Sequence, residues 1–295
     1  MLKNTQPLVI YHGTGCLDGF GSAYAAYCFF HKKNGITAEY VGAGHGDEPP
    51  LVDGRDVYIL DFSYKRDLLS TICSKAKKVV ILDHHESAKN DLLGLDETYS
   101  NLTILFDMNR SGAVITWEYF HEEPVPPLLA HIQDRDLWQF RIPDSKHVNA
   151  ALMSYPFEFE LWDEFACGID HLKSNDHLKT LIVEGRAINR FRDKMIEHYK
   201  TKVVYGTIAG FSVPIVSCPN FITSELLSEL AKGYPFAASY SDRVTKRGWS
   251  LRSSPEGENV ADIASAFGGG GHPRAAGFST KISEQLFFVS SRSSS

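Results

Sequence analysis

Imidazole and carboxylate side chains follow the short apolar segments in the first half of the sequence. Carboxylate oxygen is the preferred ligand of hard divalent cations, and neutral imidazole is also tolerated. Three carboxylates and two imidazoles carry a charge of about −3, so two divalent ions leave a local surplus of about +1, which suits a phosphate. The candidate ligands are His12, Asp18, Asp61, His84 and Asp134.

Each of these residues also has a purely structural interpretation. A single aspartate at the start of a helix is commonly a cap, and for Asp18 taken alone this interpretation is favoured. His84 and His85 are adjacent on an expected strand, so their side chains point to opposite sides unless the strand has already turned. Asp83 is expected to orient a histidine rather than bind metal, and Asp136 either acts similarly or pairs with Arg135.

A second group of polar residues lies near the end of the chain. Four glycines, 268–271, precede His272 and Arg274, and Arg252 lies on the preceding expected strand. Glycine lets backbone amides approach an anion closely, and arginine suits phosphate. We therefore expect Gly269, Gly270, Gly271, His272, Arg274 and Arg252 to bind substrate. The alternative is a loop that only closes the second domain.

Arg110 and Ser111 stand at the start of an expected helix over 111–121. The backbone amides of such a start can hold a phosphate, so both residues are candidate substrate contacts. The alternative for Ser111 is an ordinary helix cap.

The elements that must position these residues alternate along the chain. Apolar runs at 8–11, 56–61 and 78–83 predict strands, and helix-like stretches at 18–32, 65–76 and 111–121 separate them. This alternation predicts an α/β fold with a mostly parallel sheet, in which ligands bind at the carboxyl ends of the strands. A long helix follows at 177–199, then expected strands at 202–208 and 211–216, a helix at 224–232 and a hairpin over 236–252.

These elements predict two α/β domains with the active cleft between them. The expected boundaries are a metal-binding catalytic domain over 1–175, a linker helix over 176–200, a smaller substrate-binding domain over 201–285, and a flexible tail over 286–295.

The composition and net charge limit the kinds of partner that we expect the protein to bind. The 295 residues are 43% hydrophobic and 22% charged, which is typical of a globular protein, and the net charge is −6. This charge disfavours long nucleic acid and leaves a short anionic ligand open. The absence of a long apolar run, of a leader-like start and of CxxC pairs among the five cysteines predicts a reduced cytoplasmic protein with no membrane contact. A homodimer is possible.

Six motifs extend these observations to a family. HGTGCLDG, ILDFS, LDHHES and the aspartate of HIQDRD resemble, in order, the four motifs of the DHH phosphoesterase superfamily. FDMNRSGAVITWEYF is similar to the segment between the third and fourth motifs, and FGGGGHPRAAGF to the glycine-rich motif of the DHHA1 domain. The resemblance runs from about residue 8 to 280, nearly the whole chain.

The resemblance implies a phosphodiesterase with two divalent ions, usually Mn²⁺, with Mg²⁺ or Co²⁺ possible. By motif, His12 binds the first ion, Asp18 the second, Asp61 bridges both, and His84 and Asp134 complete the second site. Asp61, His84 and His85 are then the catalytic residues, with His85 free to contact the scissile phosphate.

Cys16 departs from the family pattern, which usually has aspartate at this position. Manganese and magnesium disfavour a thiol, so the first metal site is weaker, water-filled or tuned to another metal. The alternative is that Cys16 is a small loop residue that binds nothing.

The expected reaction is hydrolysis of short linear oligonucleotides or dinucleotides, such as pGpG or nano-RNA, to 5′-mononucleotides. One alternative is a 5′–3′ exonuclease on single strands, which needs a basic, aromatic-lined channel. The other is a non-catalytic nucleotide sensor, and a pyrophosphatase is less favoured because of the DHHA1-like ending.

Overall fold

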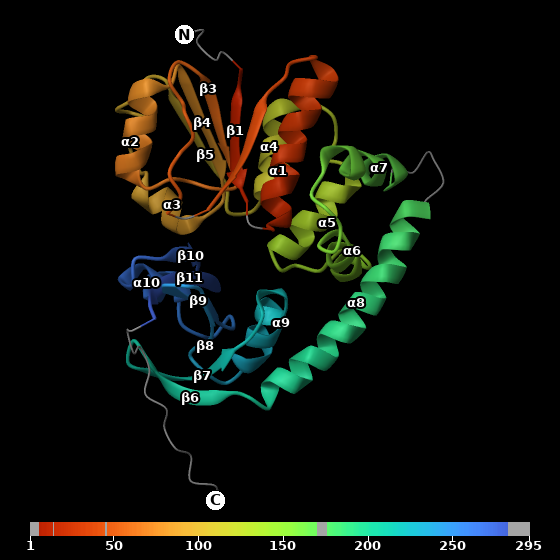
Figure 1. Cartoon of the computed structure of the whole chain (residues 1–295), viewed down its shortest axis with the longest axis vertical. Helices are drawn as coiled ribbons and strands as arrows, with labels where there is room; N and C mark the ends of the chain where they lie inside the picture. Colours follow the sequence, from red (N-terminus) through yellow and green to blue (C-terminus); the bar gives the residue numbers. More distant parts are fainter. Residues whose placement is uncertain (1–5, 14, 45, 170–175, 283–295) are drawn as a thin grey trace, which may run out of the picture. The chain divides into compact units, whose positions relative to one another are not determined.

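The computed structural model describes residues 6–13, 15–44, 46–169 and 176–282. The chain forms two compact units, Met1–Asn189 and Arg190–Ser295, whose elements are labelled in Figure 1. We describe each unit by itself. The tail expected over 286–295 lies outside the described residues.

The first unit is built on a five-stranded parallel sheet with the order β2-β1-β3-β4-β5. Its strands are β1 (Leu8–His12), β2 (Glu39–Ala43), β3 (Asp56–Leu60), β4 (Lys78–Asp83) and β5 (Leu102–Phe106). The three strands expected from the apolar runs are present, and the α/β fold class is confirmed. The sequence analysis did not predict β2 and β5.

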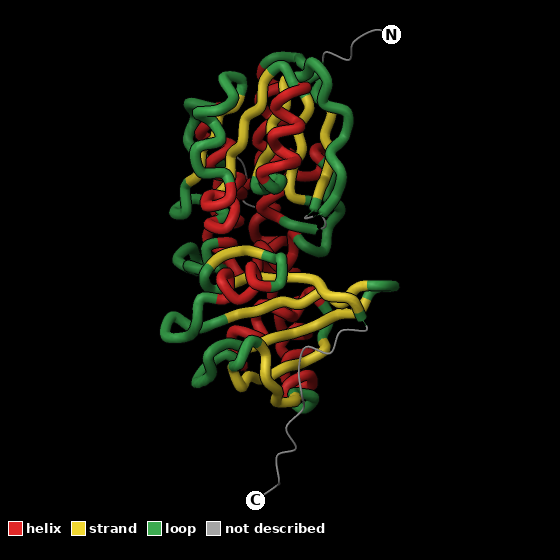
Figure 2. The backbone as a smooth tube through the Cα atoms, turned by 90° about the vertical axis from the view of Figure 1, so that its left-hand side faces the viewer, coloured by secondary structure: helices red, strands yellow, loops and turns green. Residues whose placement is uncertain are grey.

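Helices cover both faces of this sheet, as Figures 1 and 2 show. They are α1 (Leu17–Tyr27), which continues as the π-helical turn η1 (Cys28–Lys33), α2 (Arg66–Lys75), α3 (Glu86–Asp91) and α4 (Gly112–Phe120).

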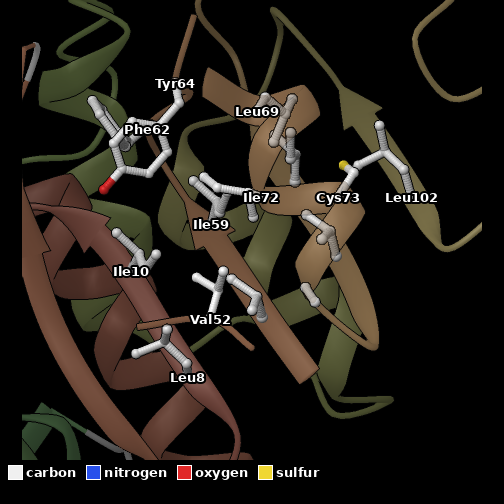
Figure 3. Close-up of a cluster of buried hydrophobic side chains, with 14 of the residues drawn as sticks. Leu8, Ile10, Val52, Ile59, Phe62, Tyr64, Leu69, Ile72, Cys73 and Leu102 are labelled. Atoms are coloured by element: carbon white, nitrogen blue, oxygen red, sulfur yellow. The ribbon is translucent and has the colours of Figure 1, made fainter. Parts of the chain in front are cut away.

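Alternate residues of each strand point to opposite faces, and this divides the core into two. Leu8 and Ile10 of β1 pack with Ile72 of α2 in one buried cluster, which is drawn in Figure 3. Val9, between them in sequence, packs in a second cluster with Ile115 of α4. Burial on both faces explains why the strands read as continuous apolar runs.

Three further helices extend the first unit beyond the sheet. They are α5 (Pro127–Asp136), α6 (Ser145–Leu152) and α7 (Phe159–Ile169). Trp162 of α7 is fully buried, and its ring centroid lies 4.8 Å from that of Phe20 in α1. Leu129 and Ile132 of α5 belong to the same buried cluster, so the HIQDRD segment packs close to α1.

Helix α8 (Asp176–Lys200) carries the division between the two units, which falls after Asn189. Leu181 is buried in a core cluster of the first unit, and Ile196 in one of the second. Among the described residues, no helix is both long and apolar enough to span a membrane.

The second unit contains a six-stranded mixed sheet with the order β10-β11-β9-β8-β7-β6. Only the β7–β8 pairing is parallel among those described in this sheet. Its elements are β6 (Val204–Ile208), β7 (Phe211–Ser217), α9 (Asn220–Leu230), β8 (Ala237–Asp242), β9 (Lys246–Arg252), α10 (Val260–Ala266), β10 (Gly270–His272) and β11 (Ala275–Lys281). Helix α9 begins four residues earlier than expected, directly after Pro219, whose fixed φ suits a helix start.

Candidate metal centre

The carboxyl ends of β1, β3 and β4 bring the predicted ligands together. Tyr11 of β1 is in register with Leu60 of β3, and Leu60 with Leu82 of β4. The next residues along these strands are His12, Asp61 and, after Asp83, the pair His84 and His85. Parallel strands in register end at one edge, so ligands distant in sequence become neighbours.

Asp61 is the centre of this cluster. Its Oδ1 lies 3.0 Å from His84 Nε2, and its Oδ2 lies 3.5 Å from His12 Nδ1. The Cys16 thiol lies 3.6 Å from the same Oδ2. Ligand atoms within 4.8 Å of one another form three groups around Asp61, namely His12–Cys16–Asp61, Asp18–Asp61–His84 and Asp61–Asp83–His85.

The backbone of Asp61 adopts a left-handed conformation with φ 52°, which aspartate tolerates better than most residues. Gly112, at the start of α4, lies directly against it. A methyl group at position 112 would lie 2.4 Å from the Asp61 Cβ. Only glycine lets α4 approach this closely, so Gly112 positions Asp61. The sequence analysis did not single out Gly112, although it lies beside Ser111 in the motif.

Asp18 combines the two roles that the sequence left open. Its carboxylate accepts hydrogen bonds from the backbone amides of Gly112 at 2.6 Å and Ala113 at 3.0 Å, so it caps α4. Its Oδ2 also lies 3.5 Å from His84 Nε2, within the cluster. A carboxylate oxygen has two lone pairs, so the cap leaves capacity for a cation.

The structure leaves Asp134 outside the described groups of ligand atoms around Asp61, and its binding to a metal ion stays a prediction. Both Asp134 carboxylate oxygens accept backbone hydrogen bonds, from Arg141 at 2.7 Å and Ile142 at 3.1 Å. Asp136, at the end of α5, instead reaches the cluster, with its Oδ2 3.6 Å from His84 Nε2. The two aspartates are two residues apart in sequence, so a motif alone does not separate them.

Asp83 holds His85, as expected of a residue that orients a histidine. Its Oδ1 lies 2.7 Å from His85 Nδ1, and its Oδ2 accepts a hydrogen bond from the Ser63 hydroxyl at 2.7 Å. Burial raises the pKa of Asp83, but the charge and hydrogen bond of His85 outweigh it and bring the pKa to about 2. Asp83 therefore remains ionised and fixes the His85 ring.

The cluster carries more negative than positive charge in its buried interior. Burial, Asp61 and Asp136 together raise the pKa of Asp18 well above its ordinary value. Burial lowers the pKa of His84, but the Asp61 hydrogen bond and the Asp136 charge raise it to about 11. A raised carboxylate pKa beside a raised imidazole pKa shows that the site favours added positive charge. Divalent cations fit both this charge and the oxygen and imidazole donors.

Cys16 lies in the cluster but also has a local role. Its sulfur accepts a hydrogen bond from the Gly19 amide at 3.4 Å and caps α1. Burial, Asp61 and Asp18 raise the pKa of the Cys16 thiol well above its ordinary value. Without a cation, the protonated thiol is therefore favoured here.

The structure places Arg110 and Ser111 differently from each other. Arg110 forms ion pairs with Asp107 and Glu118, and its Nε lies 2.8 Å from Asp107 Oδ2. Ser111 is fully buried, and its side chain does not cap α4, because Asp18 does so. Burial raises the pKa of Asp18, and the Ser111 hydroxyl partly offsets this effect. Arg110 is thus paired with carboxylates, and a contact of Arg110 or Ser111 with substrate stays a prediction.

The candidate arginines of the second unit have clear structural roles. Arg274 donates hydrogen bonds to the carbonyl oxygens of Gly257 and Pro255, both at 2.7 Å, so it ties the 253–258 loop. Arg252 donates to the Ser224 hydroxyl at 2.9 Å.

The glycine-rich segment forms β10 and its approach to β11. A methyl at Gly269 would lie 2.1 Å from the Gly277 carbonyl oxygen. Gly270, Gly271 and His272 pair with β11. Gly269 is thus required by strand packing, and a contact of Gly269, Gly270, Gly271, His272, Arg252 or Arg274 with substrate stays a prediction.

Known proteins resemble this chain in sequence and in fold. An uncharacterized protein of Acanthamoeba polyphaga mimivirus is 29% identical over 303 aligned residues, which span 93% of this chain and 68% of the viral protein. No family model matches the sequence.

Among solved structures, the DHH domain of a member of a family of ribosomal proteins superposes with a TM-score of 0.54. It is 12% identical, and the match covers 94% of this chain and 83% of that chain. The chain has the fold of a DHH-domain protein. A pGpG-specific phosphodiesterase from Vibrio cholerae aligns with a TM-score of 0.49 at 14% identity, covering 94% of each chain.

The chain thus combines a DHH-like fold with a buried cluster of histidine and aspartate side chains. The cluster lies where this class of fold places its ligands, at the carboxyl ends of the parallel strands.

Proposed function

We propose that this chain is a metal-dependent phosphodiesterase that hydrolyses short linear oligonucleotides or dinucleotides to 5′-mononucleotides. The observation that carries the proposal is the convergence of His12, Asp18, Asp61, His84 and Asp136 at one sheet edge with an excess of carboxylate charge. Divalent ions held there, for which Mn²⁺ is our first expectation, supply Lewis acidity and positive charge at the phosphoryl oxygens.

Asp61 and His85 have different roles in the proposed reaction. Asp61 contacts both His12 and His84, so it is the residue placed to join two cation sites. Asp83 holds the His85 ring through Nδ1, and the His85 centroid lies 4.9 Å from that of His84 and 6.1 Å from that of His12. His85 is therefore positioned to donate a hydrogen bond or a proton to a phosphate bound at the cluster.

The preference for short substrates rests on charge. A net charge of −6 repels a long polyanion, whereas a compact cationic centre attracts a single phosphodiester. This is the same argument that leaves nano-RNA and linear dinucleotides such as pGpG as the favoured substrates.

The test is to incubate the protein with Mn²⁺ and 5′-phosphorylated oligonucleotides of two to ten nucleotides and to resolve the products by length. We expect dinucleotides to be converted to mononucleotides, and EDTA to abolish the reaction. Processive shortening of the longest strands with little action on dinucleotides would favour the single-strand exonuclease. Saturable binding without any product would favour the nucleotide sensor.

A further inference from the structure

The loop that follows Asp136 presents two aromatic rings to solvent. Trp138 is 43% exposed and Phe140 is 38% exposed, and their ring centroids lie 4.9 Å apart in an edge-to-face arrangement. The other three tryptophans of the chain, Trp117, Trp162 and Trp249, are at most 9% exposed. Large exposed rings in a pair call for a reason beyond packing.

The backbone of this loop is strained at both rings. Trp138 has φ 57° and Phe140 has φ 50°, a left-handed conformation that bulky residues rarely adopt. Glycine or asparagine would fit these positions without strain, so local stability does not explain the aromatic residues. Strained residues of this kind cluster at active sites and ligand-binding sites, where the surrounding structure holds them in place.

The surrounding structure holds the loop rigidly in this conformation. Five consecutive backbone amides, those of residues 138–142, donate hydrogen bonds within the segment. Trp138 donates to the Arg135 carbonyl, and the other four donate to Asp134. The carbonyl oxygen of Asp134 accepts from residues 139 and 140, and its carboxylate accepts from residues 141 and 142. Asp134 is thus the residue that fixes the two rings.

The same segment connects the rings to the metal centre. Asp136 reaches His84, and Trp138 is only two residues further along, so the Cα atoms of Asp136 and Trp138 lie within about 7 Å. An aromatic surface on the segment that also carries Asp136 is suited to bind a nucleobase next to a phosphate at the cluster, because every base presents a π-face.

We propose that Trp138 and Phe140 form a stacking platform for one base of the substrate while the adjoining phosphate lies at the Asp61 cluster. The inference rests on the proposed function, and it defines the substrate class as nucleotides rather than base-free phosphate esters or polyphosphates. It also gives separate roles to the two aspartates, since Asp136 faces the metal centre and Asp134 builds the platform.

The fluorescence of Trp138 can report ligand binding at the platform, because Trp138 is the one exposed tryptophan of the four. We would titrate the protein in Mg²⁺ with 5′-GMP and 5′-AMP, following tryptophan emission, and measure the same affinities by calorimetry. Ribose 5-phosphate and inorganic phosphate are the base-free probes. We expect saturable quenching by both nucleotides and none by the base-free probes.

Substitution separates stacking from folding. Trp138→Ala should weaken 5′-GMP binding roughly ten-fold and leave ribose 5-phosphate binding unchanged. Trp138→Gly should do the same and keep the thermal midpoint of unfolding, because glycine relieves the strained φ. Tyr119→Ala is the matched control, since Tyr119 is a 38% exposed aromatic residue of α4 in the same unit. Its affinities should equal those of the parent.

The outcomes distinguish this inference from the proposed function. Three results would each overturn the platform. The first is equal weakening of nucleotide and base-free binding in the variants, and the second is unchanged nucleotide affinity in folded Trp138→Gly. The third is the absence of nucleotide binding by the parent. Hydrolysis of phosphodiesters with unchanged nucleotide affinity in Trp138→Gly would overturn the platform alone. Nucleotide binding through Trp138 without hydrolysis would overturn the proposed enzymatic function and support the stacking platform.

Discussion

Asp134 and Asp136 have the same side chain and almost the same place in the sequence, yet their surroundings differ completely. Asp134 is 4% exposed and each of its carboxylate oxygens accepts a hydrogen bond from a backbone amide, whereas the Asp136 side chain is 29% exposed and faces His84. Which oxygen atoms remain available for a cation is decided by where α5 ends and the chain turns back. The HIQDRD motif does not contain that information.

Substitution of Asp136 should therefore reduce activity, whereas substitution of Asp134 should reduce stability. Asp136→Ala removes a group that faces the cluster, so we expect hydrolysis to fall by more than about 100-fold with little change in stability. Asp134→Ala removes the acceptor for the partly buried backbone amides of Arg141 and Ile142 and should cost about 2 kcal/mol in the free energy of unfolding. Urea unfolding and Mn²⁺ titration of both variants test this. A loss of Mn²⁺ affinity confined to Asp134→Ala would restore the original assignment.

Cys16 offers a second test at the scale of one residue. Its sulfur lies 3.6 Å from Asp61, so a charged carboxylate at this position should complete a site of hard ligands, whereas the neutral serine hydroxyl is a poorer ligand. We expect Cys16→Asp to raise Mn²⁺ affinity and Cys16→Ser to lower it. Both affinities are measured by calorimetry. If both variants match the parent, Cys16 is only the cap of α1.

At the scale of elements, the site depends on two close approaches. Strands β1, β3 and β4 deliver ligands to one edge, and the start of α4 lies against Asp61 because residue 112 is glycine. The same helix start is capped by Asp18 across 94 residues of sequence. One contact thus joins the first and fourth helices at the site.

Gly112→Ala tests this dependence. The added methyl would lie 2.4 Å from the Asp61 Cβ, so either α4 or Asp61 must move. We expect a stability loss of about 1–3 kcal/mol and at least about ten-fold less activity. Gly248→Ala is the control, because a methyl there would meet nothing nearer than 3.8 Å. Full activity of Gly112→Ala would show that the close approach does not position Asp61.

Much of this element pattern was predictable, for a physical reason. Strands β1, β3 and β4 are buried on both faces, and a strand buried in this way has a continuous apolar sequence that can be recognised. Strand β2 lies at the sheet edge with its residues half exposed, so its run is too short and mixed to predict. The roles of Arg110 and Arg274 were not predictable, since no periodicity of the sequence marks their partners.

At the scale of the whole molecule, charge argues for a small substrate. The chain carries 36 acidic and 30 basic residues, so a long polyanion gains no general attraction. In the proposed function, cations bound at the Asp61 cluster provide the attraction locally. The preference for a small anionic substrate was predicted from composition and from the order of the motifs. They did not predict the aromatic pair after α5, because exposure and backbone strain are properties of the folded loop.

Substrate length is the corresponding prediction. We expect kcat/KM to fall steeply between two and about five nucleotides, because added phosphates bring repulsion without matching contacts. Rates on 5′-phosphorylated substrates of two, three, five and twenty nucleotides, at fixed ionic strength, provide the measurement. Equal kcat/KM for a dinucleotide and a twenty-mer would contradict it and favour the single-strand exonuclease.

The central claim is that Asp61 joins cations that hydrolyse a phosphodiester, and one substitution tests it most directly. Asparagine keeps the volume of Asp61 and tolerates its left-handed φ of 52°, so Asp61→Asn should fold. We would measure hydrolysis of a 5′-phosphorylated dinucleotide in Mn²⁺ by the parent and by Asp61→Asn, with circular dichroism to verify folding. The account predicts Mn²⁺-dependent turnover by the parent and a rate at background for Asp61→Asn. Parental turnover by folded Asp61→Asn would contradict it.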